Sequence, residues 1–186
     1  MKRVAALLVA TTFLAACGGT ADETARTPQV QGPVFLARTA GPGGPVGGYD
    51  AVGLGRRFEL PGGIEAPDGR SYYAVEDGEL LRFSTLTGRV TRSYPLRGDW
   101  TLAGVSATGA WVALSRPGTE ILVVDTERGV ATHELDLSGN FTVETISSAG
   151  DFLFLQQNFV DGSYAVRGYD LVANRLLPGS SGRRAR

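Results

Sequence analysis

Residues with catalytic or metal-binding chemistry are few in this chain. It has a single cysteine, Cys17, and a single histidine, His133. An internal disulfide, a cysteine-rich zinc site and a two-histidine metal site are therefore excluded. No Gly-x-Ser-x-Gly sequence is present, so the usual nucleophile signature of a hydrolase is missing. His133 has no second ligand type near it in the sequence, and we interpret it as a surface or sheet-edge histidine. The sequence predicts no catalytic residue, no metal site and no cofactor.

Two short segments place an acid or an amide beside an aromatic ring. They are Asp99-Trp100 and Asn140-Phe141, and Glu144 follows shortly after the second. An acid next to an aromatic side chain can hold a cation or the face of a sugar, so such a segment could contact a ligand. The alternative is structural: Trp100 and Phe141 would pack between layers of the domain, and Asp99 would cap a turn.

Charge excludes one class of partner. Lysines and arginines number 18 against 19 acids, which gives a formal net charge of −1 with both signs interspersed. Proteins that bind nucleic acid electrostatically carry a basic patch or a clear excess of positive charge. We therefore expect no nucleic-acid partner.

The N-terminus has the features of an export signal. Lys2 and Arg3 precede an apolar run of 13 residues, Val4 to Ala16, that only two threonines interrupt. A helix needs about 20 apolar residues to cross a bilayer, so this run is too short to span one. We interpret residues 1–16 as a signal peptide that forms a short apolar helix and is removed on export.

The end of this segment, Leu14-Ala15-Ala16-Cys17, resembles the lipobox of bacterial lipoprotein precursors. The resemblance implies cleavage before Cys17, a lipid joined to its thiol, and several acyl chains, palmitate among them. Two or more acyl chains hold a protein stably on a membrane. We therefore expect a lipid anchor at the extracytoplasmic face of the cell membrane. The alternative is an ordinary signal peptide that happens to contain a cysteine.

Composition divides the remainder into three parts. Residues 17–33 are small and polar without an apolar period, and we expect a flexible, lipidated tether. Residues 179–186 contain two serines and three arginines and are expected to form a disordered tail. The folded domain is therefore expected over residues 34–178.

The folded domain repeats with a period of about 41 residues. Ile64, Val105 and Ile146 are each 41 residues apart, and the same number separates Gly88 from Gly129. Each unit reads as four strands, with a tight turn where Ser or Asp is followed by Gly. No segment beyond the signal has a helical period of 3.6 residues. A period of 40–45 residues with four strands per unit is typical of propeller blades.

Two runs near the middle of the domain are apolar at consecutive positions. They are Trp111-Val-Ala-Leu and Ile121-Leu-Val-Val. A strand that is apolar on both faces is covered on both faces, as when sheets stack on one another. The expected fold class is therefore all-β, with stacked four-stranded sheets.

Residues 58–178 resemble the YVTN-type, broadly WD40-like, β-propeller repeats of bacterial exported proteins. The family's Ser-Pro-Asp-Gly turn corresponds to Ala66–Gly69, and its Asp-x-x-Thr-Gly turn corresponds to Ser84–Gly88 and Asp125–Gly129. The Trp-Asp dipeptide of WD40 repeats is absent. The resemblance implies propeller-like blades, three complete and one partial. It also places Asp99, Trp100, Asn140 and Phe141 at the mouth of a central channel, with Glu144 further inside. These five residues are therefore the candidate ligand contacts.

The number of units leaves the architecture and the function open. The partial unit would be supplied by Val34–Ala40 and Tyr49–Val52. It either completes a four-bladed ring or leaves an incomplete ring with an exposed edge. Without a chemical constellation, we expect a lipid-anchored binding or assembly protein for an envelope protein or polymer, rather than an enzyme. One alternative is a propeller-type hydrolase or lyase that uses Asp99 and Glu144. The other is a fragment of a longer propeller.

Overall fold

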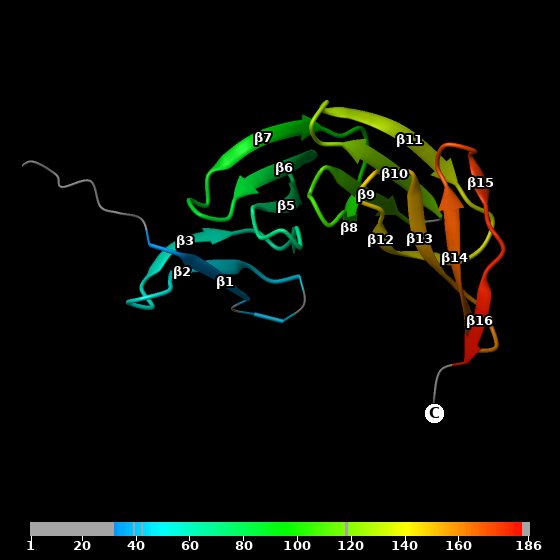
Figure 1. The fold of residues 1–186 in the computed structure, drawn as a ribbon, viewed down its shortest axis with the longest axis horizontal. Helices are drawn as coiled ribbons and strands as arrows, with labels where there is room; N and C mark the ends of the chain where they lie inside the picture. The colour runs from blue at the N-terminus through cyan, green and yellow to red at the C-terminus, as the bar shows by residue number, and fades with distance from the viewer. Residues whose placement is uncertain (1–31, 39, 42, 118, 184–186) are drawn as a thin grey trace, which may run out of the picture. The chain divides into compact units, whose positions relative to one another are not determined.

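The computed structural model describes residues 32–38, 40–41, 43–117 and 119–183. The expected signal helix, Cys17 and most of the tether lie outside the described residues. All regular structure in the described part is β-strand, and sixteen strands form four antiparallel sheets that follow one another in chain order (Figure 1). No helix among these residues is long and apolar enough to cross a membrane. The expected all-β, propeller-like class is confirmed.

Each sheet is a meander, because strands that are consecutive in sequence pair as neighbours. The first sheet contains β1 (Val34–Arg38), β2 (Val46–Asp50) and β3 (Arg56–Leu60). The second contains β4 (Ile64–Glu65), β5 (Ser71–Glu76), β6 (Glu79–Ser84) and β7 (Val90–Pro95). The third contains β8 (Thr101–Val105), β9 (Trp111–Arg116), β10 (Glu120–Asp125) and β11 (Val130–Asp136). The fourth contains β12 (Phe141–Ile146), β13 (Phe152–Asn158), β14 (Ser163–Asp170), β15 (Arg175–Leu176) and β16 (Ser180–Arg183).

The expected disordered tail is wrong in part. Ser180–Arg183 form β16, which pairs with the first half of β14, while the two-residue strand β15 pairs with the other half. The physical reason is the length of β14, because its eight residues leave an unpaired edge that β15 is too short to cover. Unpaired strand edges recruit any segment that can supply hydrogen bonds.

One type of turn recurs between the last two main strands of a unit. In the second and third sheets, the amides of Gly88 and Gly129 donate to the carbonyls of Ser84 and Asp125, each at 2.8 Å. Both glycines have positive φ, 66° and 72°. The first sheet makes the same turn with a leucine at this position: Leu54, with φ of 55°, donates from its amide to the carbonyl of Asp50. The turn that the sequence predicted from two units therefore also closes the partial unit.

The strands at the middle of the domain are covered on both faces, as expected. Ile121 and Val123 of β10 belong to the core between the third and fourth sheets. Leu122 and Val124 belong to the core between the second and third sheets. Side chains alternate across a strand, so the unbroken apolar run of β10 supplies both cores.

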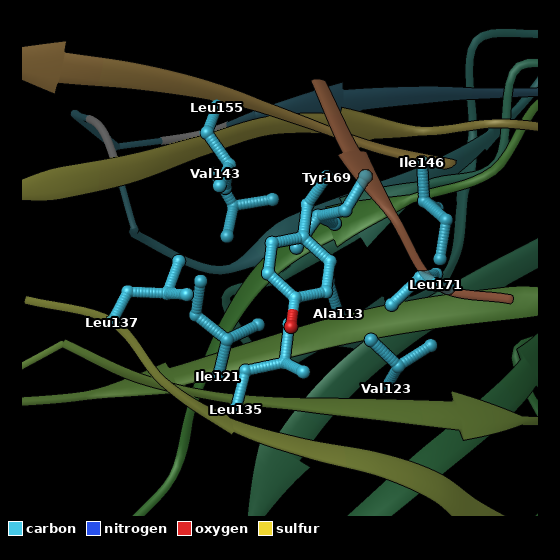
Figure 2. Packing of buried hydrophobic residues seen from close by; sticks show 11 residues of the cluster. Ala113, Ile121, Val123, Leu135, Leu137, Val143, Ile146, Leu155, Tyr169 and Leu171 are labelled. Carbon is cyan, nitrogen blue, oxygen red and sulfur yellow. The ribbon is translucent and has the colours of Figure 1, made fainter. Parts of the chain in front are cut away.

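Three apolar cores join the four sheets in series. The core between the third and fourth sheets surrounds Tyr169, whose ring lies among aliphatic side chains of both sheets (Figure 2). The core between the first and second sheets is smaller and includes Val46, Leu60 and Tyr72. Among the described residues, the first and fourth sheets share no core.

Candidate binding site

The structure places the two predicted acid–aromatic and amide–aromatic segments at equivalent points. Asp99 and Trp100 lie directly before β8, and Asn140 and Phe141 lie at the start of β12. Each segment therefore leads into the first strand of its own sheet. The chain brings Asp99 next to Trp100, and Asn140 next to Phe141, but the two pairs belong to different sheets.

Trp100 is an element of the core as well as a surface feature. Its side chain is 6% exposed and contributes to the core between the second and third sheets. The indole Nε1 donates a hydrogen bond to the carbonyl of Arg97 at 2.8 Å. The guanidinium carbon of Arg116, at the end of β9, lies 4.6 Å from the ring centroid. Both contacts fix the ring plane, so Trp100 is preorganised.

The second segment borders a separate hollow. Asn140 and Phe141 line a space of about 480 Å³ together with Leu102 and Glu120. The Asn140 carbonyl accepts a hydrogen bond from the amide of Asn158 at 2.8 Å. Asn140 is exposed and Phe141 is half-buried against the core between the third and fourth sheets.

The two predicted carboxylates belong to different sheets. Asp99 is exposed before β8, and Glu144 is exposed in β12, at a bulge between Val143 and Thr145. Neither carboxylate has a hydrogen bond or an ion pair to a described residue. General acid–base catalysis by two carboxylates requires both groups to reach one substrate. Acid–base catalysis by Asp99 and Glu144 stays a prediction from the sequence.

A groove of about 470 Å³ lies beside Trp100, between the second and third sheets. Its volume falls within the range of about 300–1,000 Å³ that is typical of small-molecule sites. The apolar lining comes from both sheets: Tyr94, Leu96, Trp100, Leu122, Val124 and Ala131. Three charged side chains, Arg97, Arg116 and Glu134, also border it. An apolar floor with a few polar groups is the usual composition of a ligand site.

The charges around the groove are unequally neutralised. Arg116 forms ion pairs with Glu120 and, at 3.9 Å, with Glu134. The Arg97 side chain forms no hydrogen bond or ion pair to any described residue, so its positive charge is available to a ligand. The groove thus combines an apolar surface with one uncompensated cation.

Tyr94 contributes a fixed, uncharged edge. Its hydroxyl donates to the carbonyl of Thr126 at 2.6 Å. Burial raises the pKa of the Tyr94 hydroxyl above its ordinary value, although the nearby Arg92 opposes this change. Tyr94 therefore stays neutral where it lines the groove.

Most groove residues were not predicted from the sequence. Leu122 and Val124 were recognised as doubly covered strand residues, but the apolar run alone does not show that part of one face borders a groove. Arg116 and Glu134 lie on different strands and meet only because β9, β10 and β11 are neighbours. The one groove residue that the sequence singled out as a ligand contact was Trp100, which directly follows Asp99. Within the described part of the chain, no group of His, Cys, Asp and Glu side chains could hold a metal ion.

Comparison with known proteins supports the fold. No family model and no curated protein sequence matches the chain. Among many similar solved structures, hydrazine synthase from Kuenenia stuttgartiensis, which contains a β-propeller, superposes with a TM-score of 0.54 at 18% identity. The match covers 89% of this chain and 53% of that chain, so the chain spans about half the length of this neighbour. The structure titled U3-55K superposes with a TM-score of 0.45 at 16% identity, over 64% of this chain and 38% of that one. The likeness to the hydrazine synthase structure supports the fold class of propeller-like blades.

Proposed function

We propose that this protein is a lipid-anchored, extracytoplasmic binding protein whose propeller-like domain takes its ligand in the groove beside Trp100. The signal-like N-terminus and the lipobox-like sequence before Cys17 support the anchor. The groove supports the binding role, because it combines a ligand-sized volume with an apolar lining and one unpaired cation. That groove is the observation on which the binding role depends.

The groove favours a ligand with an apolar or aromatic body and an anionic group. Trp100, Leu122 and Val124 would cover the apolar body, which loses its contact with water on binding. The unpaired Arg97 would pair with the anionic group at the rim. Such a ligand is either a small amphipathic molecule or an aromatic–acidic segment of an envelope protein.

Two fluorescent probes of matched shape test the groove. Anilinonaphthalene sulfonate is aromatic and anionic, and N-phenylnaphthylamine is a neutral analogue. We expect Ala131→Trp, which fills the groove from β11, to weaken binding of both probes at least about 10-fold, whereas Ala131→Ser leaves it unchanged. Arg97→Ala is expected to weaken only the anionic probe. If the Ala131→Trp variant binds both probes as tightly as the wild-type chain does, the proposed site is refuted.

The anchor is tested separately. Cells that express the chain are grown with radiolabelled palmitate, and the Cys17→Ser variant serves as the comparison. We expect label on the wild-type chain, recovery in the membrane fraction, and loss of both in the variant. Label that persists on Cys17→Ser would exclude this anchor without affecting the binding proposal.

A further inference from the structure

The second, third and fourth sheets each direct one apolar cross-strand pair toward the sheet that precedes them in the chain. In the second sheet, the rings of Tyr72 and Phe83 are 6.2 Å apart in an edge-to-face arrangement. Equivalent pairs occupy the same register in the third and fourth sheets, next to the residue that opens the recurring turn. The three pairs are Tyr72–Phe83, Val112–Val124 and Leu153–Tyr169. Every one of these side chains is at most 7% exposed.

The first sheet carries the same pair, but no sheet formed by the described residues packs in front of it. Phe35 and Tyr49 are opposite one another across β1 and β2, and their rings stack with centroids 5.6 Å apart. Tyr49 directly precedes Asp50, which opens the turn of that sheet, as Phe83 precedes Ser84. Phe35 is nevertheless 42% exposed. Neither ring belongs to a core formed by the described residues.

On its opposite face, the fourth sheet has no core formed with another sheet of the described part of the chain. In the third sheet, Ala113 and Ile121 turn toward the following sheet and are 0% and 2% exposed. The equivalent residues of the fourth sheet are Phe154 and Val166. They are 40% and 43% exposed, although side chains of this size are normally buried. Exposed apolar side chains that cluster on one face mark interaction sites.

We propose that these two faces bind each other between two copies of the chain, with the fourth sheet of each copy against the first sheet of its partner. The arrangement continues the packing between sheets within one chain. There, the face that a sheet turns toward the next sheet always packs against the face that the next sheet turns back toward it. It is independent of the groove beside Trp100, which lies inside one copy.

Two copies suffice to cover every such face. Four sheets in each copy give eight in the pair, which is within the usual range of about 4–8 blades in propellers. In the proposed pair each copy contributes one face of each kind, and a two-fold axis relates the two contacts of the closed assembly. A larger open chain of copies would leave one apolar face uncovered at each end.

Glutamate substitutions on the two faces test the pairing in the full chain, studied by sedimentation in density-matched detergent. We expect the wild-type chain to sediment with twice the mass of one copy. Phe35→Glu on the first sheet and Phe154→Glu on the fourth should each raise the dissociation constant about 100-fold or more, because a carboxylate would be buried without a partner. Val166→Glu provides a second variant of the fourth sheet. Leu86→Glu, at a 59% exposed apolar position in a turn of the second sheet, is the matched control and should leave association unchanged.

A mixing experiment distinguishes this pairing from other modes of association. An equimolar mixture of the Phe35→Glu and Phe154→Glu chains retains one intact contact, so dimers should partly return. A symmetric contact between two fourth sheets would instead be lost with Phe154→Glu alone and unaffected by Phe35→Glu, which overturns the proposal. A wild-type chain that stays monomeric at about 100 μM also overturns the proposal. Another part of the same chain would then cover the two faces.

Discussion

The contact between Trp111 and Gly150 gives the most direct test of the packing between sheets. Gly150 lies in the turn before β13 with φ of +74°, and a methyl group on it would stand 2.6 Å from Cζ2 of Trp111. Alanine in this backbone region costs about 1–2 kcal/mol, and forcing a methyl group into a packed contact costs about 1–3 kcal/mol. We therefore expect Gly150→Ala to lower the free energy of unfolding by about 2–5 kcal/mol.

A second glycine separates the two contributions. Gly162 has φ of +80°, and a methyl group on it would meet no heavy atom within 4 Å. Gly162→Ala should therefore show only the backbone cost of about 1–2 kcal/mol. Urea unfolding followed by far-ultraviolet circular dichroism measures both, since it does not depend on the Trp111 signal. Equal losses of stability for the two variants, within about 0.5 kcal/mol, would refute the packing argument.

Three further changes have defined outcomes. Tyr73→Phe removes a buried hydrogen bond of 2.6 Å to the carbonyl of Gly109, and urea unfolding should show a loss of about 1 kcal/mol. Asp50 accepts hydrogen bonds from the Val52 amide and from Arg57, which lower its pKa. This stabilisation is therefore present above the ordinary aspartate pKa of about 4 and is lost as pH falls through the lower folded value. The difference in melting temperature between the wild-type chain and Asp50→Asn should accordingly shrink below pH of about 4. Leu54→Gly relieves a left-handed leucine with φ of 55° that is 67% exposed, and thermal melts should show a gain of up to about 1 kcal/mol.

Each of these changes has its own control. Tyr164 makes no hydrogen bond through its hydroxyl to a described residue, so Tyr164→Phe should be neutral, and an equal loss at both tyrosines would contradict the role of the Gly109 contact. A pH-independent difference for Asp50→Asn would show that the charge of Asp50 is irrelevant. A loss of stability in Leu54→Gly would mean that the leucine side chain has a contact that outweighs its backbone strain.

Local patterns predicted the strands and their turns because both depend on neighbouring residues. The Asp125–Gly129 turn follows from an aspartate whose side chain accepts the amides of Glu127 and Arg128 and from a glycine that tolerates positive φ. The consecutive apolar residues of β10 predicted a strand covered on both faces, and the cores confirm it. The period also varies by one residue, since Gly69 and Gly109 are equivalent but 40 apart.

The tail and the groove could not be predicted in the same way. The pairing of β16 depends on how much of β14 the short strand β15 leaves open. The groove depends on Arg116 lying over Trp100 and near Glu134, and these residues come from segments that the sequence gives no reason to associate. Contacts between side chains of different sheets cannot be predicted from the residues that neighbour them in the sequence.

The sequence by itself determined the export signal-like start, the strand-rich repeats and the absence of a cysteine or histidine cluster, because residue type and short spacing are sufficient for these conclusions. Only the tertiary structure decided which apolar faces are covered and which are not. Phe35 and Tyr72 occupy equivalent positions in their sheets, yet one is 42% and the other 1% exposed. The difference arises because burial depends on the sheet that packs against a residue, not on the residue or its neighbours in the chain.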